Sequence, residues 1–585
     1  MKFPSLENIT TATRNSVLRF PLAILLSLFT AGLLIYLVEN EPSQTENSYF
    51  SMMLSLAIGF PLMIGLQLVA EQFLERPLIR AGLYLLGVLF IIWYYFFLSP
   101  DFGVLELTRP VRFVSLLVIA HLFVSVAPFI KGGIVNDFWE YNKSIFVQWF
   151  IGALYATVIY SGLAIAVLAV DQLFDVKVDY KVYLHLFIIV AAVFHPFYFT
   201  SNFPKRVHGE SIDNHDSKGI KNLVLFILIP LSMLYFLILY LYGFKILVSW
   251  NLPKGWVSSL VIGFSVAGTL TYLLNYRLAD ILDNAILIWF KKWFFYILAP
   301  LVILLHIAIL KRIDDYGITP ERYFVLLTGI WLSILSGYFI ISSKDNIKWI
   351  PTSLIVFLLI GTISPIDAFR VSAHSQMNKL MLFLKEKKAI KENKIAPDPK
   401  NFKYEEVYKL TSMIELLEEL KSIDKVNDML IKPVSKTEVN GITTKNIIKH
   451  LGLENVNDVS SNQYLNYNSD ASQRIELEGY KLLLPVNIYK GGIYDNGVQL
   501  NKTNDTLLFK ENTKVMDMVS LKLLIKNLES KYGKHKENLK PEECSFILDS
   551  RLYKIKLIIT QLSVEKINED NEISSLTGYI LLNKK

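Results

Sequence analysis

The sequence has one cysteine and few charged residues for its length. Asp, Glu, Lys and Arg make up 19% of the 585 residues, whereas soluble proteins average about 25%. The single cysteine, Cys544, excludes an internal disulfide and a thiolate metal cage. We therefore expect Cys544 to be a small buried hydrophobe, and the fold to depend on neither cross-links nor zinc.

The net charge is also small, at +7 over the whole chain. No dense stripe of Lys and Arg alternates with aromatic residues, as a nucleic-acid groove would require. We expect no DNA or RNA partner.

The common catalytic motifs are missing from the sequence. It contains no phosphate-cradling glycine-rich loop, no G-x-S-x-G elbow, no H-E-x-x-H and no paired-cysteine motif. Enzymatic function is therefore unsupported, although it is not excluded. We assign no catalytic residue, expect no cofactor and no metal, and favour a protein that is not an enzyme.

Long apolar segments are what the sequence has in abundance. Hydrophobic residues make up 52% of the chain and aromatic residues 13%, and the mean hydropathy is +0.38. A bilayer core about 30 Å thick needs roughly 20 apolar helical residues, and unsatisfied backbone amides in lipid make each crossing segment a helix. About eleven runs qualify, the last being short and containing Pro351, near 18–38, 50–70, 80–98, 111–130, 145–170, 182–200, 222–248, 257–275, 293–310, 323–341 and 348–365.

Basic residues in the short loops predict the orientation, because Lys and Arg are retained on the cytoplasmic side. The first loop after a crossing, "ENEPSQTENSYF", has three acids and no base. We expect residues 1–17 to be a cytoplasmic tail. With eleven crossings, the C-terminal domain would lie on the outer face, although the basic stretch "LKEKKAIKENK" beyond the last run favours the opposite side.

Hydropathy falls after about residue 370, which divides the chain. We predict a transmembrane helical domain over 18–369, a helical connector over 370–430 and a soluble α+β domain over 431–585. Runs such as "KLLLPVNIY", "DTLLFK" and "RLYKIKLIITQLSV" indicate strands, with a helix expected over 515–530. The predicted fold class is an all-α polytopic membrane bundle of about eleven transmembrane helices followed by this C-terminal domain.

Polar side chains inside the apolar runs are candidates for function, because removing them from water is costly. His121, His195 and His306 lie in three different runs, which raises a haem or proton-path hypothesis, with hydrogen bonding between helices as the plainer interpretation. The loop 205–216 mixes His and acidic residues without the spacing of a metal site. Five prolines interrupt the runs and raise the hypothesis of a transporter with broken helices, namely Pro61, Pro128, Pro196, Pro230 and Pro300.

Two polar blocks stand out at the ends of the last apolar runs. In "DDYGITPERYF", Gly317 allows a tight turn and Thr319 can cap the next helix. No turn requires the remaining Asp314, Asp315, Tyr316 and Arg322.

The second block, "SPIDAFRVSAHSQMNKL", lies two crossings later and hence on the same membrane face. We expect the blocks to meet through hydrogen-bonding groups of Ser372, Ser375 and Gln376. An ion pair of Asp314 or Asp315 with Arg370 or Lys379 would then dock the soluble domain onto the bundle. The candidate interface residues of this second block are Ser372, His374, Ser375, Gln376 and Lys379.

These two motifs in this order resemble the bacterial membrane family called domain of unknown function 4153, mainly over residues 15–390. His374 stands where the family often has Arg, and Asp367 where it often has a small polar residue. The resemblance implies a multi-pass protein of the bacterial inner membrane and implies no reaction.

Three function hypotheses remain open at this point. The leading one is a non-enzymatic binding or sensing protein of the cell envelope, embedded in the bilayer and meeting another envelope protein or a small ligand through its C-terminal domain. The alternatives are a transporter and an enzyme on a lipid-linked substrate, the latter with Asp314, Asp315 and His374 as its polar groups.

Overall fold

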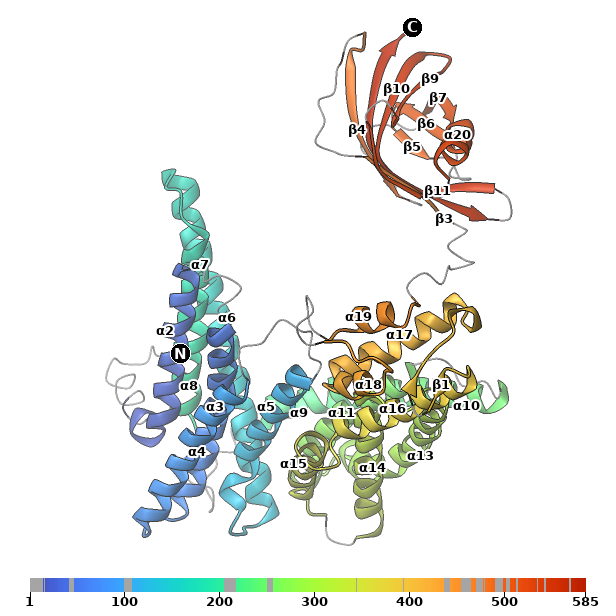
Figure 1. Ribbon diagram of the computed structural model, residues 1–585. Helices are drawn as coiled ribbons and strands as arrows, with labels where there is room; N and C mark the ends of the chain where they lie inside the picture. Colours follow the sequence, from blue (N-terminus) through green and yellow to red (C-terminus); the bar gives the residue numbers. More distant parts are fainter. Residues whose placement is uncertain are drawn as a thin grey trace. The chain divides into compact units, whose positions relative to one another are not determined.

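The computed structural model describes residues 14–585 with gaps at 15, 41–46, 99–107, 205–216, 250–255, 343–344, 393, 436–441, 454–463, 470–476, 478, 490–497, 501–505, 512–513, 534, 541–542 and 568–569. The chain forms two compact units (Figure 1). The first comprises Met1–Glu386, Glu392–Ile395 and Met413–Thr444, and the second Lys387–Lys391, Ala396–Ser412 and Lys445–Lys585.

The first unit is the expected polytopic bundle. Its helices are α2 (Pro21–Asn40), α3 (Asn47–Glu71), α4 (Pro77–Phe97), α5 (Thr108–Val126), α6 (Val135–Phe174), α7 (Tyr180–Ile189), α8 (His195–Ser201), α9 (Ser217–Leu223), α10 (Ile229–Ser249), α11 (Trp256–Asn275), α12 (Leu278–Leu282), α13 (Ala285–Tyr316), α14 (Pro320–Ile341), α15 (Trp349–Thr362) and α16 (Ala368–Glu386).

Ten helical segments among the described residues are long and apolar enough to cross a membrane. The eleventh expected run forms α15, which has 14 residues and is therefore about 21 Å long at 1.5 Å per residue. That length is shorter than a bilayer core of about 30 Å. The fold class is confirmed, and the last of the eleven predicted runs is the one whose helix is too short to cross the bilayer core.

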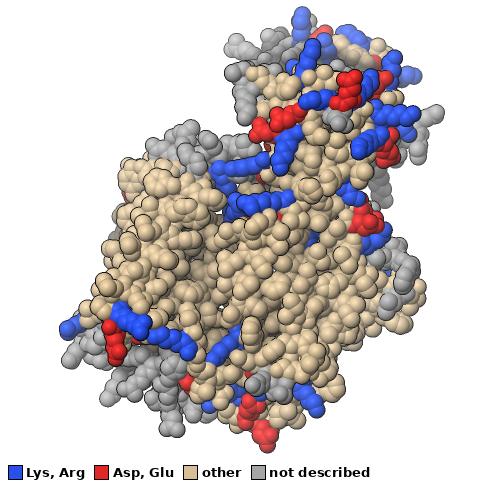
Figure 2. Space-filling model, turned by 60° about the horizontal axis from the view of Figure 1, so that its bottom comes forward, with Lys and Arg blue, Asp and Glu red and all other residues tan. Residues whose placement is uncertain are grey.

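The surface of the helices is that of a protein facing lipid. Large apolar side chains such as Leu78, Phe96 and Leu241 are mostly exposed. Over the helical unit, Figure 2 shows broad areas without charge, with Lys, Arg, Asp and Glu gathered toward the helix ends. Such a surface is stable where the solvent is hydrocarbon.

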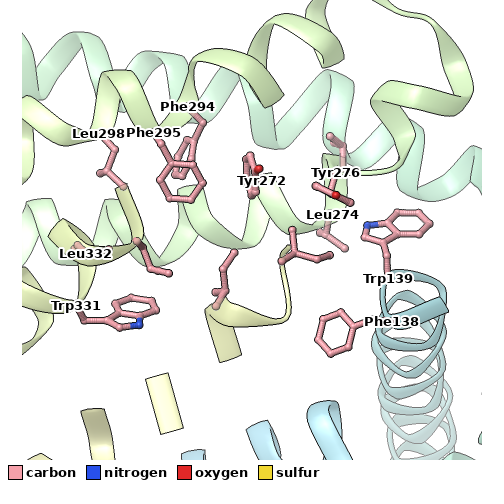
Figure 3. Close-up of a cluster of buried hydrophobic side chains, with 14 of the residues drawn as sticks. Phe138, Trp139, Tyr272, Leu274, Tyr276, Phe294, Phe295, Leu298, Trp331 and Leu332 are labelled. Atoms are coloured by element: carbon pink, nitrogen blue, oxygen red, sulfur yellow. The ribbon is translucent and has the colours of Figure 1, made fainter. Parts of the chain in front are cut away.

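Aromatic packing joins the helices inside the bundle (Figure 3). The rings of Phe295 and Phe339 stack at 4.4 Å between centroids, and Tyr272 packs edge-on against Phe295 at 4.9 Å. The indole of Trp139 on α6 donates a hydrogen bond of 2.6 Å to the carbonyl of Leu273 on α11. This bond ties helices that lie far apart in the sequence.

The five prolines have different local consequences. α3 and α13 continue through Pro61 and Pro300, and Pro128 lies in a short 3₁₀ turn, η1 (Ala127–Phe129). Pro196 and Pro230 each follow a π-helical turn, η2 (Val190–Phe194) and η4 (Val224–Leu228). A proline lacks the N–H and crowds the preceding turn, and a wider π turn accommodates it.

The remaining elements are α17 (Tyr404–Glu419), α18 (Ile423–Asp428), α19 (Thr444–His450), α20 (Lys522–Tyr532), and the strands β1 (Ile390–Lys391), β2 (Lys394–Ile395), β3 (Tyr464–Ser469), β4 (Leu482–Tyr489), β5 (Val498–Leu500), β6 (Thr506–Glu511), β7 (Lys514–Ser520), β8 (His535–Leu539), β9 (Ser545–Asp549), β10 (Tyr553–Ile567) and β11 (Asp570–Lys584).

The C-terminal part is the expected α+β domain. One sheet has the order β4-β11-β10-β3-β8 with β9 also paired to β10, and a second has the order β5-β6-β7. Its hydrophobic core combines strand residues with Leu524, Ile525 and Leu528 of α20, and Cys544 is buried in it. The helix expected over 515–530 is wrong in its first half, because Lys514–Ser520 pairs with β6 as strand β7.

A buried carboxylate joins two strand regions of this domain. Asp517 on β7 accepts hydrogen bonds from the Ser550 hydroxyl at 2.6 Å and the Leu552 amide at 2.8 Å. Burial by itself would raise the pKa of Asp517, but these hydrogen bonds outweigh it, and the pKa is lowered.

We expect Asp517→Asn to destabilise this domain by about 1 to 3 kcal/mol at neutral pH, the range for a lost hydrogen bond to a buried charged group. Because the folded pKa lies below the unfolded one, the carboxylate stabilises the fold above the ordinary Asp range, and this contribution is lost as the pH falls toward the lowered pKa. The difference from wild type should therefore shrink in acid. Hydrogen–deuterium exchange of β7 and β10 in the full-length protein measures it.

The exposed Glu405→Gln, which changes the net charge equally, is the matched control and should leave the exchange unchanged. A difference between wild type and Asp517→Asn that stays constant from neutral to acidic pH would contradict the assignment.

Candidate functional site

The first polar block spans the end of α13, a turn at residues 317–319 and the start of α14, and the turn is where the sequence indicates it. Gly317 ends α13 with a φ of +76° and donates its N–H to the Ile313 carbonyl at 2.8 Å. The Thr319 hydroxyl accepts the Arg322 amide at 3.4 Å, with Pro320 at the first helical position.

The second block binds the backbone of this turn, and we call the contact the loop–α16 junction. The Ser375 hydroxyl accepts the Ile318 amide at 2.9 Å. The Gln376 side chain donates to the carbonyls of Tyr316 at 3.1 Å and Ile318 at 2.9 Å. Lys379 donates to the Asp314 carbonyl at 2.7 Å. Three side chains of α16 thus form hydrogen bonds to one short stretch of backbone.

Gly317 is required at the junction for two reasons. Its positive φ is strained for other residues, and a Cβ added there would lie 2.9 Å from Nε2 of Gln376. A side chain at position 317 would therefore displace the Gln376 amide from its hydrogen bonds to the turn.

The acidic residues of the turn do not make the expected ion pairs. Asp315 pairs with Lys311 at 2.9 Å, and the Asp314 carboxylate lies 3.8 Å from the same ammonium. Lys379 instead donates to the backbone carbonyl of Asp314. The two carboxylates lie near Lys311, one turn earlier on α13. The predicted pairing of Asp314 or Asp315 with Arg370 or Lys379 is wrong in this respect.

The other candidates of the two blocks have local partners. The Arg322 guanidinium donates to the Gly317 carbonyl at 2.8 Å and lies over the Tyr316 ring. Nε2 of His374 lies 3.2 Å from Nδ2 of Asn378. The Ser372 hydroxyl is fully buried without a hydrogen-bond partner.

Sequence reasoning missed a buried carboxylate at the start of α16. Asp367 is 1% exposed and accepts the amides of Phe369 at 3.0 Å and Arg370 at 2.8 Å, which makes it the helix N-cap. Its second oxygen lies 3.8 Å from Arg112 of α5 and 3.6 Å from Arg370. The "SPID" stretch before a helix is the signal that could have identified the cap, whereas only the fold brings Arg112 to it.

A pocket of about 420 Å³ opens at this junction. Its lining residues come from the turn, from the segment between α15 and α16, and from α16, namely Ile318, Pro365, Arg370, Val371, His374, Ser375 and Asn378. Neither Asp314 nor Asp315 lines it, so the three polar groups of the enzyme hypothesis do not gather around this pocket.

A larger cavity of about 810 Å³ lies within the bundle. Side chains of α3, α5, α6, α8, α11, α14 and α15 line it, and most of them are apolar. Aliphatic side chains make up much of the wall, and aromatic rings join them, including Phe60, Phe146, Trp149, Phe199 and Trp331. Ligand pockets in proteins have sizes in this range and are mostly apolar.

Two of the three intramembrane histidines line this cavity. His121 lies 2.8 Å through Nδ1 from the Leu117 carbonyl, and His195 lies 3.4 Å through Nε2 from the Trp149 carbonyl. His306 lies elsewhere, 3.0 Å from the Ser333 hydroxyl on α14. The structure therefore brings His121 and His195 to one cavity. His306 instead lies within hydrogen-bond distance of Ser333 between α13 and α14.

A charged network borders the same cavity. Lys143, which is 5% exposed, lies 2.6 Å from the Glu140 carboxylate. Arg277 reaches the other Glu140 oxygen at 3.4 Å. Thr269 also lines the cavity, and its buried hydroxyl has no hydrogen-bond partner in the part of the chain that the structure describes.

Among the described residues, no group of three or more His, Cys, Asp and Glu side chains could hold a metal ion. The loop 205–216 with its His and acidic residues lies outside the described residues.

Comparison with known proteins places the helical unit in a family. The family described as Domain of unknown function (DUF4153) matches residues 78–380, which includes both polar blocks. A protein of Pasteurella multocida (strain Pm70), named "Uncharacterized protein PM1469", is 26% identical over 231 residues. That alignment covers 39% of this chain and 39% of the relative, so the chain spans about two fifths of the relative's length. No solved structure matches.

We expect Gln376→Ala to loosen the loop–α16 junction, because it removes both hydrogen bonds to the turn and leaves two carbonyls without that donor. A buried hydrogen bond contributes about 0.5 to 1.5 kcal/mol, so exchange of the amides over 315–319 should accelerate about tenfold. Hydrogen–deuterium exchange of the full-length protein in detergent measures this.

Asn378→Ala provides the control, since Asn378 is exposed two residues away on the same helix and its side chain lies within hydrogen-bond distance of His374 on that helix, not of the turn backbone. Equal exchange in both variants would show that the junction does not hold the turn.

Proposed function

The chain belongs to the DUF4153 family and is a multi-pass membrane protein, and from this premise we propose that it binds a lipid-like amphiphile within its helical bundle without transforming it. The observation that carries the proposal is the cavity of about 810 Å³. Ligand pockets in proteins range from about 300 to 1,000 Å³ and are mostly apolar with a few polar groups.

The lining of the cavity supports an amphiphile over a polar metabolite. Its wall is mostly apolar, with aromatic rings from several helices, so a sugar or a nucleotide would lose its hydration without recovering enough hydrogen bonds. An acyl or isoprenoid chain loses nothing on entering, and the few polar groups can orient its head. Transport, the alternative raised by the prolines, would also need such a binding site, and binding is the part of that hypothesis that the cavity supports.

The loop–α16 junction supports a sensing role for the bound state. α14 contributes Thr328 and Trp331 to the cavity wall and begins at the turn that α16 holds. The chain continues from α16 toward the C-terminal domain. We propose that a shift of α14 on ligand binding reaches α16 through this turn, and that the C-terminal domain presents the result to another envelope protein or a small ligand.

Filling the cavity tests the binding proposal. Leu270 lies on α11 and lines the cavity, so we expect Leu270→Trp to exclude the ligand by occupying its volume. Native mass spectrometry of the full-length protein, released from mild detergent, should show one retained lipid-like molecule in wild type and none in the variant.

Leu237→Trp is the matched control, because Leu237 is exposed on α10 and does not line the cavity. The proposal fails if Leu270→Trp keeps the same bound molecules as wild type, or if wild type retains none.

We also propose that the protein lies in the bacterial inner membrane with residues 1–17 in the cytoplasm and the C-terminal domain on the outer face. The shortness of α15 makes its crossing the decisive point. Reporter fusions after residue 345 and after residue 585 should lie on opposite faces if α15 crosses, with the first in the cytoplasm. Alkaline phosphatase and fluorescent protein activities measure the two sides, and reporters on the same face would overturn the orientation.

A further inference from the structure

We propose that the ligand of the intramembrane cavity is a lipid alcohol, an uncharged amphiphile whose head donates a hydrogen bond from a hydroxyl group. This inference rests on the proposed function and adds the chemical class of the ligand. It follows from the polar groups of the cavity wall, because those without a partner are mainly acceptors.

Two of these acceptors are imidazole nitrogens. A backbone carbonyl can only accept, so the ring nitrogen that faces one carries the proton. Nδ1 of His121 therefore donates to the Leu117 carbonyl at 2.8 Å, and Nε2 of His195 donates to the Trp149 carbonyl at 3.4 Å. In a neutral imidazole the other nitrogen is an acceptor. Within the described part of the chain, that second nitrogen has no hydrogen bond in either ring.

The side-chain amide of Asn142 gives a third acceptor. Its Nδ2 donates to the carbonyls of Phe138 at 2.9 Å and Ser125 at 3.4 Å, which uses both N–H bonds and fixes the orientation of the amide. Oδ1 is left without a hydrogen bond among the described residues. The cavity wall thus presents acceptors from α5, α6 and α8.

Thr269 of α11 gives an independent indication that a polar group enters the cavity. It is 6% exposed, it lines the cavity, and no described residue forms a hydrogen bond with its buried hydroxyl. Buried hydroxyls are normally paired. Because a hydroxyl both donates and accepts, an alcohol head suits Thr269 as well as the three acceptors.

The wall offers a charged head no free partner. Lys143 is the only Lys, Arg, Asp or Glu among the described lining residues, and its ammonium lies 2.6 Å from the carboxylate of Glu140, which is also buried. An anionic head would have to compete with Glu140 for this ammonium, and a cationic head would meet no carboxylate among the same lining residues. Burying an unpaired charge costs far more than burying a hydroxyl. The head is therefore uncharged.

The apolar wall distinguishes two possible sources of the hydroxyl. A free polyol such as glycerol matches the acceptors but buries little apolar surface against rings such as Phe60, Trp149 and Phe199. A hydrocarbon chain that bears a hydroxyl matches both parts of the cavity, because the chain covers the rings. The ligand is therefore a lipid alcohol.

The test compares four probes with the same chain on the delipidated full-length protein. Native mass spectrometry titrations use oleyl alcohol, the corresponding alkene without the hydroxyl, oleyl methyl ether and oleic acid, at about pH 8, where imidazole is ordinarily neutral. Neither the alkene nor the ether has a donor, and one is smaller and the other larger than the alcohol, so size cannot explain a preference. For wild type we expect the alcohol to bind at least about fivefold tighter than either, the factor for one buried hydrogen bond, and tighter than the acid.

Variants assign the preference to the acceptors. His121→Phe with His195→Phe removes both imidazole acceptors and keeps two rings, and Asn142→Leu removes the third acceptor. In at least one of these variants the preference for the alcohol over the ether should fall to about twofold or less. His306→Phe is the matched control, because His306 does not line the cavity, and it should keep the preference. The wild-type comparison decides the inference even where a variant fails to fold.

Each result bears on one proposal. Equal binding of alcohol, alkene and ether to wild type, or an unchanged preference in both cavity variants, would overturn the donor head while the binding function stands. Tighter binding of oleic acid would overturn the uncharged head, and displacement of the alcohol by millimolar glycerol would overturn the amphiphile in favour of a free polyol. Absence of binding by all four probes would overturn the lipid alcohol, and it would remove the binding function too if wild type retains no molecule from the membrane.

Discussion

The lack of hydrogen-bonding partners in hydrocarbon governs this structure. A backbone amide that leaves water for lipid must find its partner within the same segment, so the apolar runs become helices and the prolines must be accommodated locally. The π turns before Pro196 and Pro230 are that accommodation. The same constraint makes every polar side chain in the bundle a feature that needs a partner, and this makes the few exceptions informative.

The loop–α16 junction shows how side chains satisfy backbone that no helix can. The turn between α13 and α14 has carbonyls and an amide outside any helical ladder, and Ser375, Gln376 and Lys379 of α16 provide their partners. Gly317 suits this arrangement, because its φ is positive and a Cβ there would displace the Gln376 amide from the turn. A short polar stretch that first resembles a ligand site is in large part the means by which two elements are held in register.

The cavity presents the opposite case, in which polar groups remain incompletely paired. Glu140 Oε2 and the Thr269 hydroxyl are buried and have no hydrogen-bond partner among the described residues. Incomplete pairing in a buried site is tolerated where a ligand completes it. Unpaired polar atoms beside a mostly apolar wall fit the amphiphile that we propose as the ligand.

The sequence by itself determined the membrane bundle, the approximate positions of its helices, and the α+β character of the C-terminal domain, because hydropathy and periodicity are local properties. The predicted runs 145–170 and 293–310 were too short, since α6 and α13 begin at Val135 and Ala285. It also determined the turn at Gly317 and the cap at Thr319, which depend on neighbouring residues alone. The strand at Lys514–Ser520 was missed because its pairing with β6 outweighs a helical pattern. Only the tertiary structure decided that His121 and His195 share a cavity while His306 does not, that Arg112 reaches Asp367, and that Lys143 borders the apolar space. Each of these depends on how helices distant in sequence rotate and pack against one another, and no local pattern specifies that rotation.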